Sequence, residues 1–212
     1  MATLAVREES VSETLELLEW KRRVFALYAG VRGEADPAAA WRRWRETRDE
    51  LFRTHPQSPL PTGARAAFAG LGYFDYDPGC RVTAALADLD APPQPVEASG
   101  GGSLLFRPFA RASFELGGAP LALELYWLEG YGGGVFLPFR DGTSGAETYG
   151  GGRYILDTVK GADLGGGKDA LVLDFNFAYN PSCSYDPGWV CPLAPPANRL
   201  AVRVEAGERF AP

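Results

Sequence analysis

Apolar residues recur at helical spacing between residues 10 and 55, which predicts two helices at the N-terminal side of the chain. The sequence from Ser10 to Glu13 fits a capping box and predicts where the first helix begins. Asp36 and Pro37 supply an N-cap and a first-turn proline for the second helix, which ends at His55. The predicted apolar faces consist of Leu17, Trp20, Val24, Leu27 and Tyr28 in the first helix and of Trp41, Trp44, Leu51 and Phe52 in the second.

From about residue 70 to residue 208 the pattern changes to short apolar runs between turn residues, which is typical of β-strands. Gly117 and Gly118 predict a hairpin turn, and no helical pattern of useful length separates the runs. We therefore expect an α+β fold in a single domain over residues 1–212, with the N-terminal helices packed on an antiparallel β-barrel or β-sandwich. Residues 90–102, rich in Pro and Gly, are predicted to form a long loop. The predicted strands are Gly72–Tyr76, Arg81–Leu86, Leu104–Phe106, Ala112–Leu116, Leu121–Leu128, Val135–Phe139, Arg153–Asp157, Ala170–Phe177 and Arg199–Glu205.

Composition narrows the class of protein. A hydrophobic fraction of 46% and an aromatic fraction of 12% indicate a globular chain rather than a disordered one. The net charge of −6 disfavours nucleic-acid binding, which needs a basic face, and the Arg-rich run from Trp41 to Arg48 is interpreted as a solvated helix face. No signal pattern opens the chain and no apolar run approaches a membrane span. We therefore expect a cytoplasmic protein that binds neither nucleic acid nor membrane.

The residue types present exclude most metal and cofactor chemistry. His55 is the only histidine, which excludes zinc and iron motifs that use two histidines. Cys183 and Cys191 lack CxxC partners, so a zinc knuckle is not expected, and whether the two pair is left open. No phosphate-binding loop motif is present, and we predict neither a cofactor nor a metal. Glycine triplets at 100–102, 132–134 and 165–167 are interpreted as turns, whereas the triplet at 150–152 also permits close approach of a ligand.

A polar constellation surrounds this last triplet and a later strand. Strand geometry places Asp174 and Asn176 on one face, where unpaired polar groups would be costly, and Arg153 could pair with the carboxylate. One interpretation is a pocket in which Arg153 binds the charge of a small anionic molecule. The other is a purely structural Arg–Asp bridge, with no ligand, in an interaction module. The remaining members of the predicted pocket are Tyr149, Tyr154, Asn180, Asp141 and Thr143, of which Asp141 and Thr143 also fit a plain turn.

A hydrolase is the second hypothesis for function. His55 is the natural general base at neutral pH, and Cys183 or a bound water is the candidate nucleophile. The hypothesis requires the imidazole within hydrogen-bond reach of the thiol, directly or through one water. The structural alternative for His55 is a side chain at the C-terminus of a helix, where the dipole favours it. The identity of the ligand and the oligomeric state are left open by these patterns.

Several motifs in order resemble one prokaryotic family. They read HPQSPL, GLGYFDYD, FRDGTSGAETYGGGRY, DFNFAYNPSC and CPLAPPANRL. Together they resemble the bacterial and archaeal domain-of-unknown-function family numbered sixteen eighty-four, from about Trp20 to Glu208. The resemblance implies a single domain of about this length and no known activity. The chain has Ser184 where the family often has Ala, and Ala197 where it often has an acid. The family motifs include Ser58, Asp141, Thr143, Tyr149, Arg153, Tyr154, Asp174, Asn176, Asn180, Cys183, Cys191 and Asn198.

Overall fold

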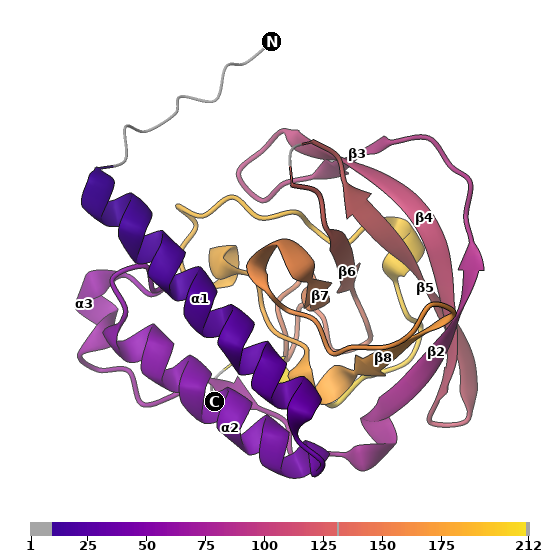
Figure 1. The fold of residues 1–212 in the computed structure, drawn as a ribbon, viewed down its shortest axis with the longest axis horizontal. Helices are drawn as coiled ribbons and strands as arrows, with labels where there is room; N and C mark the ends of the chain where they lie inside the picture. The colour runs from indigo at the N-terminus through magenta and orange to yellow at the C-terminus, as the bar shows by residue number, and fades with distance from the viewer. Residues whose placement is uncertain (1–9, 131, 211–212) are drawn as a thin grey trace.

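Helices gather at one edge of the molecule, and the strands curl beside them (Figure 1). The computed structural model describes residues 10–130 and 132–210, so residues 1–9, from which no signal pattern was expected, lie outside it. The helices are α1 (Val11–Gly33), α2 (Pro37–Thr54) and α3 (Thr62–Arg65), and the strands are β1 (Gly72–Tyr73), β2 (Arg81–Asp88), β3 (Gln94–Glu97), β4 (Ser103–Leu116), β5 (Ala119–Leu128), β6 (Val135–Phe139), β7 (Arg153–Asp157), β8 (Ala170–Asp174) and β9 (Glu208–Arg209).

The signals that delimit the two long helices are confirmed. Ser10 and Glu13 form the capping box, in which each side chain accepts a hydrogen bond from the other residue's backbone N–H. The Asp36 carboxylate caps α2, and His55 occupies its C-cap. Leu17, placed on the apolar face by its spacing, is instead exposed. The helix starts were therefore encoded locally, while burial depended on what packs against each turn.

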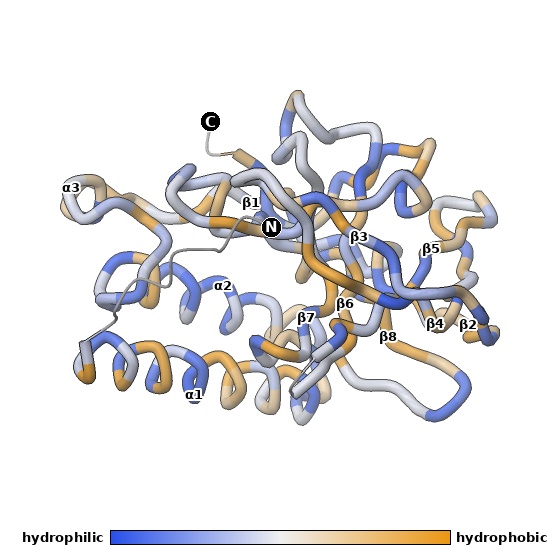
Figure 2. Tube along the Cα trace, turned by 90° about the horizontal axis from the view of Figure 1, so that it is seen from above, coloured by the Kyte–Doolittle hydropathy of each residue, from blue (hydrophilic) through white to orange (hydrophobic). Residues whose placement is uncertain are grey.

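The two helices lie side by side and cover one flank of the sheet (Figures 1 and 2). Trp41 of α2 donates its indole N–H to the carbonyl of Asn176 at 2.9 Å, and the fully buried Trp44 contacts Phe177 edge-on. Aromatic side chains supply much of the buried area of such contacts, and the buried indole N–H of Trp41 has its partner here. The apolar stripe of α2 thereby holds the helical layer against the segment that follows β8.

The sheet is antiparallel and curls into a half-barrel. Its strand order is β7-β6-β5-β4-β2-β8, with β3 added to β4, and β1 pairs with β9 separately. This arrangement confirms the α+β prediction and shows a curled half-barrel where barrel and sandwich were the alternatives. Gly117 and Gly118 form the predicted turn between β4 and β5, both with positive φ, as a tight hairpin requires.

A bulge in β4 gives the sheet part of its curl. The register shifts between Pro108 and Ala110, which leaves Phe109 as the extra residue opposite β5. Beyond the bulge, a small second cluster of buried residues includes Phe106 and Tyr126, separate from the main core. The strands predicted at Leu104–Phe106 and Ala112–Leu116 are therefore parts of β4. Its buried side chains join a different cluster on each side of the bulge.

Other strand predictions were wrong where a buried side chain forms hydrogen bonds with the backbone. Residues 199–205 form no strand, although Leu200 and Val204 are buried: Leu200 bonds to the backbone of Arg140, whereas the backbone of Val204 bonds to side chains. The strand predicted to reach Phe177 ends at Asp174, whose carboxylate accepts the N–H of Asn176 and starts a short 3-10 helix. The predicted loop at residues 90–102 contains β3, and the predicted first strand is confined to β1.

Asn198 joins the sheet where β5 and β6 diverge. The two strands pair only near Tyr126 and Trp127. Further along, the Asn198 amide accepts the N–H of Glu124 at 2.8 Å and donates to the carbonyls of Glu124 and Pro138, at 2.9 and 2.7 Å. One side chain thus satisfies backbone groups on two strands that no longer reach each other.

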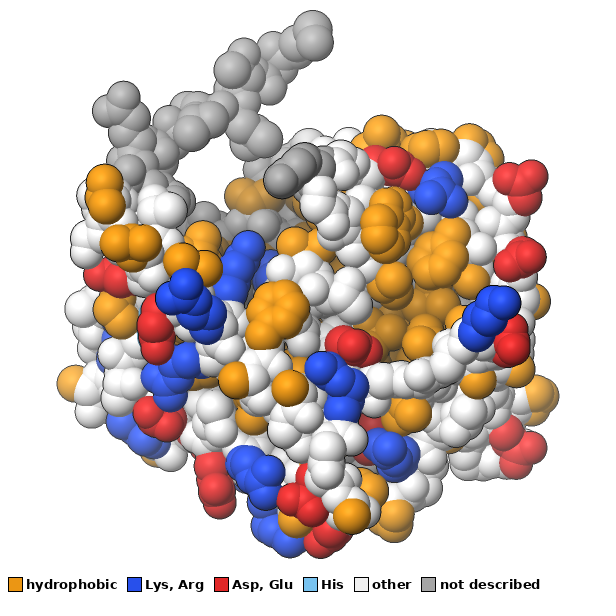
Figure 3. Space-filling view, in the orientation of Figure 1, with side chains coloured by type: hydrophobic (Ala, Val, Ile, Leu, Met, Phe, Trp, Pro, Cys, Tyr) orange, Lys and Arg blue, Asp and Glu red, His pale blue; other side chains and the backbone are white. Residues whose placement is uncertain are grey.

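The surface differs between the two halves of the molecule. On the face shown in Figure 3, hydrophobic side chains gather in a hollow over the curled sheet, whereas acidic and basic side chains are interspersed over the helices. Surface ion pairs on the helices include Arg43 with Glu34 and Arg23 with Glu50, both at 2.9 Å. Within residues 10–130 and 132–210, no helix is both long and apolar enough to cross a membrane.

Candidate functional site

Arg153, the predicted centre of the site, is fully buried in β7. Its guanidinium donates to the backbone carbonyls of Val204, Ala206 and Glu208 and contacts the Asp141 carboxylate at 3.4 Å. Burial lowers its pKa, against the attraction of Asp141. We call Arg153, Asp141, Thr143 and these three carbonyls the Arg153 network. It holds residues 204–208 against the sheet.

Asp141 and Thr143 belong to this network through short hydrogen bonds. The Asp141 carboxylate accepts the N–H of Val204 at 2.7 Å and the hydroxyl of Thr143 at 2.9 Å. The Thr143 hydroxyl also lies 3.0 Å from that of Thr148. The predicted turn is present, and its acid additionally binds a segment distant in sequence.

Asp174 and Asn176 form a second polar tie. The expected pair between Arg153 and Asp174 is not formed, because Asp174 contacts Arg81 at 3.2 Å instead. The Asn176 amide donates to the carbonyl of Asp77 at 2.7 Å and accepts its N–H at 2.9 Å. Burial raises the pKa of Asp174, while its bonds to Asn176 and Arg81 oppose the rise. These contacts fasten the end of β8 to the start of β2.

His55 and Cys183 each have partners of their own. The imidazole Nδ1 accepts the N–H of Gln57 at 3.0 Å, and Nε2 contacts the Glu19 carboxylate. The Cys183 thiol lies 3.5 Å from the hydroxyl of Tyr149. In the part of the chain that the structure describes, no hydrogen bond joins His55 to Cys183. The direct hydrogen bond, one of the two arrangements that the hydrolase hypothesis allows, is therefore not formed.

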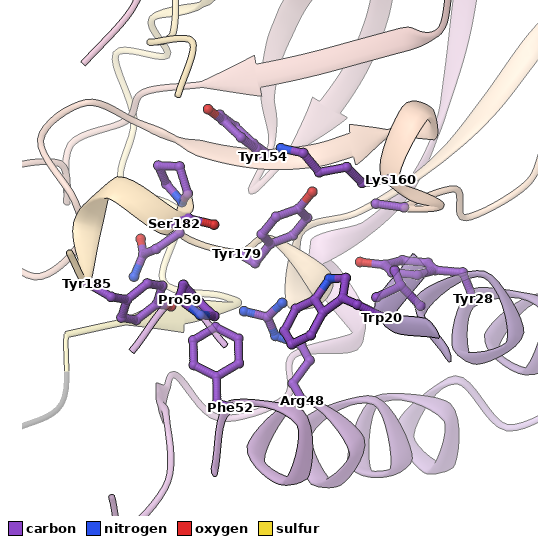
Figure 4. Close-up of a pocket in the computed structure, with 14 residues that line it drawn as sticks. Trp20, Tyr28, Arg48, Phe52, Pro59, Tyr154, Lys160, Tyr179, Ser182 and Tyr185 are labelled. Atoms are coloured by element: carbon purple, nitrogen blue, oxygen red, sulfur yellow. The ribbon is translucent and has the colours of Figure 1, made fainter. Parts of the chain in front are cut away.

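A cavity lies instead between the two long helices and the sheet (Figure 4). Its volume is about 80 Å³, and it is partly open to solvent. Tyr154 and Asn180 belong to its wall, whereas Arg153, Asp174, Asn176, Asp141 and Thr143 do not. We call this cavity the aromatic crevice. Its lining consists of Trp20, Val24, Tyr28, Arg48, Phe52, Pro59, Tyr154, Lys160, Ala162, Tyr179, Asn180, Pro181, Ser182 and Tyr185.

Arg48 forms part of the crevice wall from α2. Its guanidinium lies over the rings of Phe52 and Tyr179, 5.2 and 5.1 Å from their centroids, and contacts the buried Glu208 carboxylate at 2.7 Å. Burial raises the pKa of Glu208 to about 7, although the attraction of Arg48 opposes this. The guanidinium is therefore fixed by aromatic rings and by an acid that does not line the crevice.

Lys160 contributes the second cation, from the turn after β7. Its ammonium lies 3.2 Å from the carboxylate of Asp157, and its side chain is half-exposed. Desolvation lowers its pKa, but Asp157 together with Cys191 and Cys183 outweighs this, and the pKa is raised. Figure 4 shows the side chain of Lys160 extending toward Tyr154, above the ring of Tyr179.

Three buried polar atoms on the crevice lining have no hydrogen-bond partner among the described residues. They are the hydroxyl oxygens of Tyr28 and Tyr185 and the amide oxygen of Asn180. The indole N–H of Trp44 lies close enough to Tyr28 to lower the pKa of its hydroxyl, but the two do not meet in hydrogen-bond geometry. Buried polar atoms are normally satisfied, so an open group on a cavity wall indicates a place for water or a ligand.

The crevice was not predicted from the sequence. Trp20 and Tyr28 were assigned only to an apolar helix face, and Lys160 carried no signal. Arg48 was placed on a solvated face, although its side chain is 13% exposed. Trp44 and Phe52 each lie one helical turn from Arg48, and this spacing could have placed it on the apolar face.

The family match covers the strands of this chain but not its two long helices. Residues 66–209 match the model of a family described as protein of unknown function (DUF1684), which leaves α1 and α2 outside the match expected from about Trp20. The solution NMR structure of an uncharacterized protein from Haloarcula marismortui is 37% identical, with a TM-score of 0.57. That match covers 78% of this chain and 90% of the other. No curated protein matches.

Proposed function

Because the chain belongs to DUF1684, a family of proteins of unknown function, we propose its function from the crevice itself: the protein binds a small anionic molecule there. The observation that carries this proposal is the charge of the lining. Arg48 and Lys160 both line the crevice, and no acidic side chain among the described residues does. A cavity with cations on its wall and acids behind them favours an anion.

The acids behind the cations hold them in position. Glu208 contacts Arg48 and Asp157 contacts Lys160, and both carboxylates are almost fully buried. Fixed charges lose little side-chain entropy when a ligand arrives, which favours binding. An anion that enters the crevice approaches Arg48 and Lys160 on the side that Glu208 and Asp157 do not occupy.

The ligand has an anionic head and an apolar body. A cavity of about 80 Å³ accommodates a group the size of a carboxylate or phosphate. The lining includes aromatic rings, among them those of Trp20 and Phe52, against which a flat apolar body packs. The hydroxyls of Tyr28 and Tyr185 supply donors for the head group. Arg48 and Lys160 thus take the role expected of Arg153, while Tyr154 and Asn180 keep a place in the site.

A cytoplasmic location is proposed with this function. All three cysteines are unpaired, which is usual in proteins of a reducing compartment. Separation of cell fractions with an antibody to the protein tests the location, and recovery from the extracytoplasmic fraction would refute it.

Benzoate and benzamide provide a matched pair of probes, because they share a ring and differ in charge. We expect benzoate and phenyl phosphate to shift the NMR signals of the Trp20 and Trp44 indoles in a saturable way, and benzamide to bind at least about 10-fold more weakly. Phenyl phosphate against benzoate distinguishes the two head groups. Equal affinity for benzoate and benzamide would refute an anion site.

Lys160→Gln is the decisive variant. We expect about 10-fold weaker binding of benzoate, since a hydrogen bond to a charged group contributes about 1.5–3 kcal/mol. Lys168→Gln is the matched control, because Lys168 is exposed and does not line the crevice. Equal losses in the two variants would indicate general charge attraction and would contradict the site.

A further inference from the structure

Asn180 lies on the wall of the aromatic crevice, and only one end of its side-chain amide is used. The residue is 4% exposed, and its Nδ2 donates to the Glu208 carboxylate at 3.4 Å. The amide oxygen Oδ1 is buried and has no hydrogen-bond partner among the described residues. A buried acceptor without a donor is costly, so the donor for this oxygen must come from the crevice.

The other asparagines of the chain use their amide oxygen within the protein. The oxygen of Asn176 accepts the N–H of Asp77 at 2.9 Å, and that of Asn198 accepts the N–H of Glu124 at 2.8 Å. Both side chains are fully buried, and neither lines the crevice. The asparagines that hold the fold together therefore have both ends of the amide bonded, whereas the one on the cavity wall leaves an acceptor open.

Glu208 determines which end of the Asn180 amide is open. An ionised carboxylate only accepts hydrogen bonds, so the amide NH₂ must face it and the oxygen must point elsewhere. The backbone N–H of Asn180 also donates to this carboxylate, at 3.1 Å, and the N–H of Glu208 donates to the carbonyl of Ala178 at 2.8 Å. Burial raises the pKa of Glu208 to about 7, so the carboxylate is mostly ionised at pH 8. Oδ1 is therefore a preformed acceptor.

The same carboxylate places a positive charge beside this acceptor. Arg48 donates to Glu208 Oε2 at 2.7 Å, and this oxygen also accepts the backbone N–H of Asn180. Arg48 and Asn180 both line the crevice, whereas Glu208 does not. A ligand whose anionic group meets Arg48 therefore has a neighbouring group close to the Asn180 oxygen. A hydroxyl can donate there without adding a positive charge beside Arg48 and Lys160, which would repel an ammonium.

We propose that the crevice selects hydroxy acids, whose carboxylate meets Arg48 and Lys160 while a nearby hydroxyl donates to Asn180 Oδ1. This inference rests on the proposed function and adds to it the second polar group of the ligand. A site built to bond a hydroxyl rejects the analogue that lacks it, because the buried acceptor is then left unpaired. Asn180 is thus the residue that determines specificity, and the cations supply the affinity for the anion.

Pairs of acids that differ only in a hydroxyl test the proposal without any change to the protein. Each enantiomer of mandelate is compared with phenylacetate, and 3-hydroxybenzoate with benzoate, through the indole NMR signals at pH 8. In at least one pair we expect the hydroxy acid to bind at least about 5-fold more tightly. If the parent acids bind and neither pair shows this preference, the proposal is overturned while the anion site stands. If no acid of either pair binds, the anion site fails as well.

Asn180→Leu assigns the preference to this amide, because leucine has a similar shape and no acceptor. We expect the two acids of the preferred pair to bind within about 2-fold of each other in this variant. Gln94→Leu is the matched control, since Gln94 is an amide in β3 that does not line the crevice, and it should keep the wild-type ratio. A purely structural role of Asn180 would weaken both acids equally, and an unchanged ratio in Asn180→Leu would refute the assignment. The comparison of acids in wild type requires no variant to fold.

Discussion

The Arg153 network and the aromatic crevice both gather buried polar groups beside β7, but they use them in opposite ways. In the network, the guanidinium of Arg153 is engaged by three carbonyls and the carboxylate of Asp141. In the crevice, the hydroxyls of Tyr28 and Tyr185 are buried without a partner among the described residues. A dense set of internal bonds indicates a structural tie, whereas open polar atoms on a cavity wall indicate a site.

Removal of Arg153 should have the largest effect on stability. Arg153→Met leaves Asp141 buried without its cation and three carbonyls without a donor, so we expect the free energy of unfolding to fall by about 3–5 kcal/mol. Urea denaturation measures this. Arg203→Met is the control, because Arg203 is half-exposed in its surface ion pairs and should change stability by less than about 1 kcal/mol. A loss from Arg153→Met no larger than that of the control would contradict a structural role.

Glu208 connects the two regions and should make stability depend on pH. Its pKa is raised from 4.5 to about 7, so the folded protein binds this proton more tightly than the unfolded chain does. Its contribution is therefore complete below about pH 4.5 and is lost as the pH rises through about 7.

The Glu208→Gln variant isolates this contribution. Between about pH 5 and pH 8 we expect the variant to lose about 1–3 kcal/mol less stability than wild type does. Glu205→Gln, at an exposed position, is the control and should follow the wild-type curve. Parallel curves for wild type and Glu208→Gln would show that the folded protein does not raise this pKa.

The smallest effects should come from the open hydroxyls. Tyr185→Phe and Tyr28→Phe remove groups that have no partner among the described residues, so stability should stay equal or rise by up to about 1 kcal/mol, while benzoate affinity falls. Tyr126→Phe is the matched control, because it breaks a 2.9 Å bond to Glu124 and should destabilise by about 1 kcal/mol without changing benzoate affinity. Destabilisation by Tyr185→Phe as large as that of the control would mean that its hydroxyl is already satisfied.

Local signals predicted the parts of the fold that depend on local interactions. The capping box at Ser10 and the Asp36 cap set the helix starts, and the glycine pair at 117 and 118 set the hairpin. Short apolar runs between turn residues located β6 and β7 at their observed limits. The alternating pattern at residues 199–205 did not predict the structure, because Leu200 bonds to the backbone of Arg140 and the backbone of Val204 bonds to the side chains of Arg153 and Asp141.

The candidate site could be located only in part, because its two halves meet through tertiary packing. Tyr154 and Asn180 were predicted as ligand contacts and line the crevice, but its cations come from α2 and from the turn after β7. No short-range pattern states that Arg48 and Lys160 face one cavity. The sequence also does not show whether a buried arginine binds a ligand or a backbone carbonyl. For this reason Arg153 was predicted to be the centre of a site.

Asn198 has a consequence for the order of events during protein synthesis. The backbone groups of Glu124 and Pro138 remain unsatisfied until the Asn198 amide arrives, more than fifty positions later in the chain for each. During translation, β5 and β6 can therefore be joined only near Tyr126 and Trp127, and the seam beyond that point closes only after residue 198 has been added. Hydrogen exchange at the Glu124 amide reports when that seam closes.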